Sequence, residues 1–169
     1  VLNKEYLGMG EEVNLFENEL SKLFGRKTVC VSSGTAAIQL AIEACSIGKN
    51  HEILVPSLTY VATFQAIKAT GAIPIPCEVD EKTCLIDIND AKSRITKRTK
   101  AIIPVHYTGG VGNLDQLYLF AKEFKLRVIE DAAHAFGTIY KDKRIGSIGD
   151  IVCFSFDGIK NITSGEGGC

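Results

Sequence analysis

Residues 101–129 read AIIPVHYTGGVGNLDQLYLFAKEFKLRVI and contain one complete succession of strand, helix and strand. Residues 101–105 form a short apolar run that predicts a buried strand, and residues 126–129 form a second one. Between them, apolar side chains recur at helical spacing over residues 113–125, at Leu114, Leu117, Phe120, Ala121 and Phe124. We therefore expect an amphipathic helix that connects two strands.

The remaining sequence repeats this alternation at regular intervals. We expect helices over residues 11–24, 36–47, 57–70 and 89–95, and strands over residues 28–31, 52–55, 72–79 and 151–154. Residues 1–10 lack periodicity and predict an extended lead-in. Pro74 and Pro76 give the 72–79 strand an edge-like or irregular position, because proline cannot donate to a central ladder. The alternation favours an α/β fold with a mostly parallel sheet flanked by helices.

Composition bounds the class of protein. The chain has 169 residues, of which 46% are hydrophobic, and this length suits one ordinary domain with a real core. The formal charge of −1 and the interspersed signs argue against nucleic acid and anionic membranes as partners. The basic stretch over residues 92–100 is typical of a solvated helix end and turn. No apolar run approaches the roughly 20 residues that a membrane span needs.

The six cysteines show no CxxC pair and lie mostly among apolar residues. This pattern is typical of buried free thiols, so we expect a reducing cytoplasm and predict no metal site.

Residues 28–37 predict a strand, a tight turn and a helix start, with the sequence Ser32-Ser33-Gly34-Thr35-Ala36-Ala37 at the turn. Unpaired amides at a helix N-terminus, together with the helix dipole, favour a phosphate group. Gly34 would let the backbone approach such a ligand closely. The alternative is that Ser33 or Thr35 only caps the helix.

Polar residues also follow two of the strands at their carboxyl ends, where ligands approach an open parallel sheet. His106 follows the 101–105 strand, and a structural histidine is the favoured interpretation there. Asp131 follows the 126–129 strand and needs a partner, because an unpaired buried carboxylate is costly. His134 comes three residues later, and an Asp–His pair that caps a turn is the alternative to a binding role.

Lys160 lies between the apolar run 151–154 and a stretch of glycines that ends at Gly168. An amine that attacks a carbonyl must be neutral, and burial favours the neutral form. The alternative is an ordinary lysine in a glycine-rich loop.

Four stretches together resemble the DegT/DnrJ/EryC1/StrS family of sugar aminotransferases. They are Ser155-Phe156-Asp157-Gly158-Ile159-Lys160, the Gly165-Glu166-Gly167-Gly168 run, the Ser-Gly-Thr-Ala turn and Glu130-Asp131-Ala132-Ala133-His134. The resemblance covers essentially the whole chain. It implies the large pyridoxal-phosphate-binding domain of the aspartate-aminotransferase fold type (fold type I). Residues 1–169 would be its N-terminal part, C-terminally incomplete, without the small C-terminal domain. It also implies a homodimer.

The resemblance implies a role for seven residues. Lys160 would hold pyridoxal 5'-phosphate as a Schiff base and later move a proton, and Asp131 would keep the pyridinium nitrogen protonated. Thr35, Ala36 and Ser155 would anchor the cofactor phosphate. Tyr60 would stack on the cofactor ring, and His134 would hydrogen-bond its phenolic oxygen. A core or interface position is the alternative for Tyr60.

The implied reaction moves an amino group from an amino acid, expected to be glutamate, to a nucleotide-linked keto-sugar in amino-sugar or cell-surface polysaccharide biosynthesis. A dehydratase branch of the family carries histidine at the position of Lys160, so Lys160 argues against membership of that branch. The sequence around Lys160 favours amination at sugar carbon 4. Many family members carry histidine at the position of Asp157. Many also carry a glutamine shortly after the position of Gly109, which this chain lacks. The alternative is a non-catalytic cofactor-binding or regulatory protein on the same fold.

Overall fold

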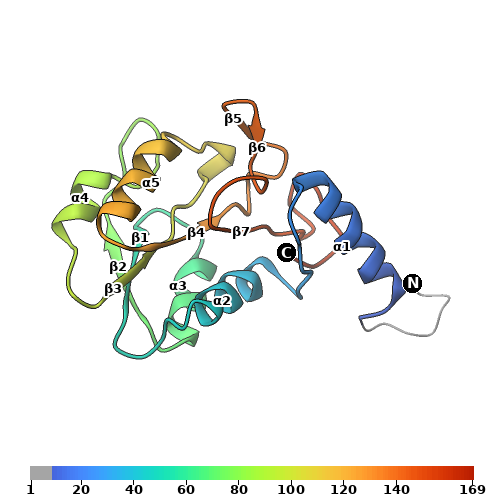
Figure 1. Cartoon of the computed structure of the whole chain (residues 1–169), viewed down its shortest axis with the longest axis horizontal. Coiled ribbons are helices and arrows are strands. Elements are labelled where there is room, and N and C mark those ends of the chain that lie inside the picture. Colours follow the sequence, from blue (N-terminus) through green and yellow to red (C-terminus); the bar gives the residue numbers. More distant parts are fainter. Residues whose placement is uncertain (1–8) are drawn as a thin grey trace.

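A five-stranded parallel sheet organises the computed structural model, which describes residues 9–169 (Figure 1). The strands are β1 (Glu52–Pro56), β2 (Ile73–Cys77), β3 (Thr99–Ile102), β4 (Arg127–Asp131) and β7 (Ile151–Cys153), in the spatial order β2-β1-β3-β4-β7. A separate hairpin pairs β5 (Ile139–Tyr140) with β6 (Lys143–Arg144). The predicted α/β fold with a parallel sheet is confirmed. Apart from Met9 and Gly10, the expected lead-in lies outside the described residues.

The helices are α1 (Glu11–Phe24), α2 (Gly34–Ala44), α3 (Val61–Ala69), α4 (Ile88–Ser93) and α5 (Leu114–Glu123), with a short 3-10 turn, η2, at Tyr107–Gly109. Four of the five were expected within a few residues. The exception is α3, which was expected from residue 57 and begins at Val61, because Tyr60 has extended backbone angles and forms its N-cap.

Alternate residues of each strand pack against different layers of helices. Ile53 and Val55 of β1 belong to a cluster with apolar residues of α2 and α3, whereas Leu54 belongs to a cluster with α1, α4 and α5. Both faces of β1 are therefore buried, as is usual for a parallel sheet. Figure 1 shows α2 and α3 below the sheet and α4 and α5 above it.

The prolines of β2 lie at one edge of the sheet, as their sequence predicted. Pro74 pairs with Ile53, and Pro76 pairs with Val55. At this edge a residue without an N–H leaves no partner strand unsatisfied.

The other end of the sheet is completed by the last residues of the chain. Residues 167–169 run antiparallel to residues 154–156, and Gly168 also pairs with Val31. The strand expected over residues 28–31 is therefore wrong except at Val31. The amides of Thr28 and Cys30 donate instead to the side chains of Ser21 and Glu17.

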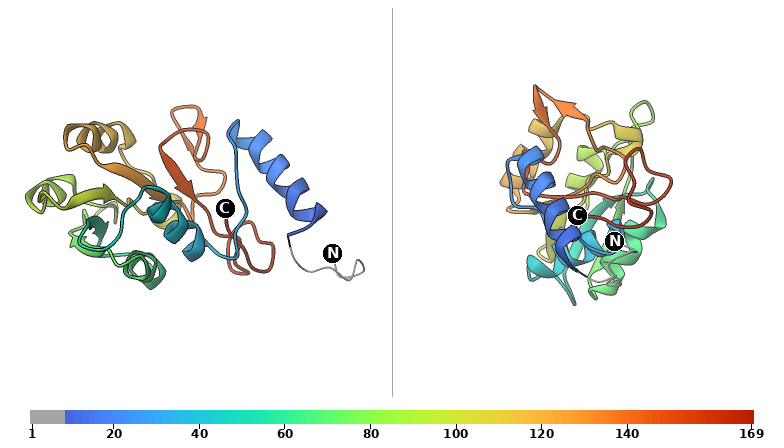
Figure 2. Two further views of the ribbon diagram at one scale, coloured as in Figure 1. Left: turned by 60° about the horizontal axis from the view of Figure 1, so that its bottom comes forward. Right: turned by 90° about the vertical axis from the view of Figure 1, so that its right-hand side faces the viewer.

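The first helix, α1, lies beside this end of the sheet (Figures 1 and 2). Phe24 stacks on Phe154 with ring centroids 5.1 Å apart, and Phe16 contacts Phe156 at 5.2 Å. Arg26 donates to the backbone carbonyls of residues 148–150. Among the described helices, none is long and apolar enough to cross a membrane, and all six cysteines are free thiols.

Candidate functional site

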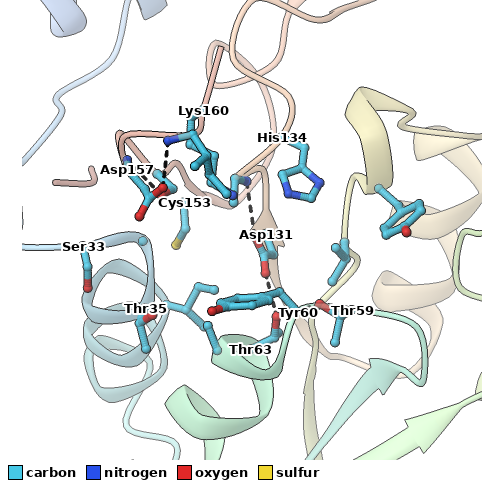
Figure 3. Close-up of a pocket in the computed structure, with 18 of the residues that line it drawn as sticks. Ser33, Thr35, Thr59, Tyr60, Thr63, Asp131, His134, Cys153, Asp157 and Lys160 are labelled. Carbon is cyan, nitrogen blue, oxygen red and sulfur yellow. Dashed lines mark hydrogen bonds between the residues drawn. The ribbon is translucent and has the colours of Figure 1, made fainter. Parts of the chain in front are cut away.

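A pocket of about 570 Å³ opens at the carboxyl ends of the parallel strands (Figure 3). Six of the seven residues singled out from the sequence line it: Thr35, Tyr60, Asp131, His134, Ser155 and Lys160. The seventh, Ala36, lies in the first turn of α2 and is not part of the wall. Strand ends that are far apart in the sequence therefore meet at one site.

The N-terminus of α2 forms one wall of the pocket. Ser33 is the N-cap and accepts a hydrogen bond from the amide of Ala36 at 3.1 Å, so the capping alternative holds for Ser33. The other amides of a first helical turn have no partner within their helix. A Cβ on Gly34 would lie 2.9 Å from the Cβ of Ser155, so a side chain at residue 34 would push these two elements apart.

Gly168 completes this wall from behind. A Cβ on Gly168 would lie 2.6 Å from the carbonyl of Ser33, and the residue pairs with Val31 and Ser155 at once. The glycines of the final stretch therefore hold the helix start and Ser155 together. In the sequence these glycines are typical of a loop, and no pattern there indicates this packing role.

Asp131 is the buried carboxylate of the pocket, with 6% of its surface exposed. Its Oδ2 accepts a hydrogen bond from the hydroxyl of Thr63 at 2.8 Å, and its Oδ1 accepts one from the amide of Ala133 at 3.2 Å. The hydroxyls of Thr63 and Thr59 lie 2.8 Å apart. These bonds fix the direction of the carboxylate, as Figure 3 shows.

Thr63 was not predicted from the sequence. It is fully buried and lies on the same face of α3 as Ala66 and Ile67. A threonine among apolar residues is the only signal that the sequence carries for it, because its partner is 68 positions away.

Glu130 precedes Asp131 and points into the opposite layer. Its Oε2 lies 2.7 Å from Nε2 of His106, and its Oε1 accepts a hydrogen bond from the hydroxyl of Tyr118 at 2.5 Å. His106 is 1% exposed, which confirms the structural interpretation of this histidine. Burial and the Glu130 charge raise the pKa of Tyr118, so its hydroxyl keeps its proton. A Cβ on Gly149 would lie 2.2 Å from the carboxylate, which shows how tightly Glu130 is enclosed.

Lys160 is half-buried on the loop that follows Ser155, rather than fully buried. Its backbone amide donates to the carbonyl of Asp157 at 2.9 Å. The side-chain amide of Asn161 donates to the carbonyl of Phe136, and the hydroxyl of Thr163 donates to the carbonyl of Phe156. These bonds hold the loop over the pocket while the lysine side chain stays accessible.

Tyr60 and His134 form the rim. Tyr60 is 73% exposed, which excludes a core position, and Figure 3 shows its ring extended along the pocket. His134 lies near Tyr107, with ring centroids 6.2 Å apart. Partial desolvation and, secondly, the charge of Lys160 lower the pKa of His134, while the charge of Asp131 opposes them. The pKa of His134 therefore depends on both Lys160 and Asp131 across the pocket.

Comparisons with known proteins agree with this geometry. A family model described as the DegT/DnrJ/EryC1/StrS aminotransferase family matches residues 1–169. Among solved structures, DesV from S. venezuelae, in complex with a ketimine intermediate, is 38% identical with a TM-score of 0.88. A putative sugar aminotransferase from Streptococcus pneumoniae, in its PMP form, is 33% identical with a TM-score of 0.92. An aminotransferase from Psychrobacter cryohalolentis is 35% identical with a TM-score of 0.89.

These alignments cover 95%, 99% and 94% of this chain, respectively. They cover 44%, 46% and 41% of the three solved chains. The chain thus spans less than half of the length of the proteins that it resembles.

Proposed function

The chain belongs to the DegT/DnrJ/EryC1/StrS aminotransferase family, and from this membership we propose that the protein is an aminotransferase that depends on pyridoxal 5'-phosphate. In this proposal the donor is an amino acid, with glutamate expected, and the acceptor is a nucleotide-linked keto-sugar of amino-sugar or polysaccharide biosynthesis. Residues 1–169 form the N-terminal part of the large cofactor-binding domain of a cytoplasmic homodimer. The observation that carries the proposal is that Lys160 and Asp131 line one pocket.

The residues present fit the phosphate end of this cofactor. The close contact between Gly34 and Ser155 puts a hydroxyl beside the N-terminus of α2, where amides and the helix dipole favour an anion. Ser33 occupies the amide of Ala36, so we assign the phosphate to Thr35 and Ser155 first and give Ala36 a lesser part. Among the described residues, Lys160 is the one lysine or arginine that lines the pocket, so we assign most of the positive potential at the helix start to the backbone.

The residues also fit the ring end. Asp131 offers a buried carboxylate that can hold a protonated ring nitrogen, and an opposite charge nearby favours that protonated form. Thr63 keeps the carboxylate aimed at the pocket by donating to its Oδ2. Tyr60 offers an aromatic face on which a ring can stack. When bound, pyridoxal phosphate supplies an electron sink for the electrons left behind when the donor loses a proton.

Lys160 carries the reactive amine. Its half-buried loop leaves Nζ accessible, so Lys160 would hold the cofactor through its aldehyde carbon and would also move a proton as base and acid. We assign His134 to the ring's phenolic oxygen. Its lowered pKa favours the neutral imidazole, which can donate one hydrogen bond and accept another.

An absorbance titration of the whole protein with pyridoxal phosphate tests the proposal. We expect a visible band from the lysine-bound cofactor that glutamate bleaches, and no such band for Lys160→Ala. Lys143→Ala, which removes an exposed lysine outside the pocket, is the matched control and should behave as the wild type. Mass spectrometry of a nucleotide-linked keto-sugar incubated with the protein and glutamate would then detect the aminated product. A band that is indifferent to Lys160, or absent, would favour the non-catalytic binding protein.

A further inference from the structure

Two cysteines face each other where the last residues of the chain join the sheet. Val31 and Gly168 exchange two backbone hydrogen bonds, with N···O distances of 2.9 and 3.0 Å. In an antiparallel pair this register sets Cys30 directly opposite Cys169, at a position that is not hydrogen-bonded. Opposite residues at such positions have Cα atoms about 4.5 Å apart and side chains on the same face.

The packing of the two side chains agrees with this register. Cys30 and Cys169 both pack against the cluster that contains Phe24, Phe154 and Phe156. Burial raises the pKa of Cys169 to about 12, and the next contribution comes from the neighbouring Cys30. Burial also raises the pKa of Cys30, with a further contribution from Glu17.

A third cysteine, Cys153, lies near Cys169 but packs on the opposite face of the sheet. Cys153 belongs to the cluster formed with α2 and α3, beside Ile129 and Ala37. The sheet itself therefore separates its sulfur from the layer that holds Cys30 and Cys169. The charge of Cys169 also contributes to the raised pKa of Cys153, but the register and the packing layer favour Cys30 as the partner of Cys169.

We propose that Cys30 and Cys169 are a modification site, a pair of thiols that closes a reversible disulfide under oxidising conditions. The Cα separation of about 4.5 Å that is typical of opposite residues at such positions is within the range of about 4.4–6.8 Å that disulfides occupy. The bridge joins the segment that leads into Ser33 and Gly34 to the segment that follows the Lys160 loop. It therefore fixes the spacing of the two backbone segments behind the pocket. This inference is independent of the cofactor and of the proposed reaction.

The oxidant in the proposed chemistry is a small disulfide such as oxidised glutathione. The thiolate of Cys30 attacks one glutathione sulfur and releases one molecule of glutathione. The thiolate of Cys169 then attacks Sγ of Cys30 and releases the second. Two electrons pass from the two cysteines to glutathione, and the two protons lost by the thiols end on the released glutathione. Because burial raises both pKa values, we expect the reaction to be slow at neutral pH and faster in mildly alkaline solution.

Peptide mapping after oxidation tests the site. The whole, folded protein is equilibrated with oxidised glutathione at mildly alkaline pH, its remaining thiols are alkylated, and it is digested without reduction. We expect a mass loss of two hydrogens and one cross-linked peptide pair that contains Cys30 and Cys169. A linkage of Cys169 to Cys153, or persistence of both thiols after prolonged oxidation, would overturn the proposal.

Variants supply a second measurement. Closing a loop of this length should raise the Tm of the oxidised wild type by roughly 10 °C relative to the reduced form. Cys30→Ser should abolish this shift. Cys45→Ser is the matched control, because Cys45 is also half-buried, and it should keep the shift. An equal shift in Cys30→Ser would contradict the proposal, and the wild-type peptide map remains decisive if that variant does not fold.

Discussion

Glu130 and Asp131 are adjacent carboxylates on β4, and they do different things. Glu130 is fully buried, and His106 and Tyr118 take up its two oxygens. Asp131 lines the pocket, and its hydrogen bonds from Thr63 and Ala133 hold it in a fixed orientation. Successive residues of a strand point to opposite faces, so one carboxylate enters the layer of α5 and the other faces the ligand side.

The difference shows that burial alone does not mark a functional acid. Both side chains are almost inaccessible, but only Asp131 borders a space that a ligand can enter. The partners of Glu130 come from the core, and satisfying them stabilises the fold. We therefore expect substitutions at Asp131 to affect activity, and substitutions at Glu130 to affect stability.

The largest expected effect is on catalysis by Asp131→Asn. Asparagine keeps the shape but cannot hold a protonated ring nitrogen by charge, so we expect kcat/KM for the transamination to fall by about 10²–10³-fold. The Tm should change by only a few degrees. Steady-state kinetics and calorimetry check both statements. A variant that lost stability and kept its activity would reverse the comparison between the two carboxylates.

The largest expected effect on stability comes from Glu130→Ala. This variant leaves His106 and the hydroxyl of Tyr118 without their buried partner, which should lower the free energy of unfolding by about 3 kcal/mol. Urea denaturation measures this change. Glu81→Ala, at an exposed position, should be nearly neutral. Equal stabilities of the two variants would show that the buried network contributes little.

Thr63→Val tests how Asp131 is oriented. Valine keeps the shape but cannot donate to Oδ2, and the loss of a hydrogen bond to a charged group should lower kcat/KM by about tenfold. Thr63→Ser keeps the donor and should stay close to the wild type. If valine and serine gave the same kinetics, the hydroxyl would have no part in positioning the carboxylate.

The smallest expected effect is a change in the titration of His134. Burial and then Lys160 lower its pKa, and the negative charge of Asp131 raises it. Asp131→Asn should therefore lower the pKa of His134 further, Lys160→Ala should raise it, and Glu130→Gln should leave it unchanged. NMR of the imidazole protons follows these shifts in the cofactor-free protein. A response to Glu130→Gln would show that the buried carboxylate also reaches the pocket.

The lowered pKa also sets a sign for stability. As the pH falls below the ordinary histidine pKa of about 6.5, the unfolded chain binds this proton before the folded chain does. His134 therefore makes unfolding easier in that acidic range. Replacing it with glutamine should weaken the pH dependence of the unfolding free energy below pH 6.5.

The sequence predicted the layers of this fold well, because apolar periodicity reports directly on burial. It also singled out six of the residues that line the pocket, whereas Ala36 lies outside the wall. It could not show that Thr63 reaches Asp131, since that bond joins positions 68 residues apart. Nor could it show that Val31 is the one residue of 28–31 that pairs as in a strand, because this depends on which residues lie alongside them.

The place of α1 has a consequence for how the chain folds as it is made. The ring contacts of Phe16 and Phe24 are with Phe136, Phe154 and Phe156, and Val31 pairs with Gly168. At about 5–20 residues per second, the ribosome needs on the order of ten seconds between Val31 and Gly168. During this interval α1 has left the ribosome, but the phenylalanines against which it packs have not. Among the described elements, α1 is thus one of the last to dock, although it is made before them, and its apolar face is exposed to chaperones until then.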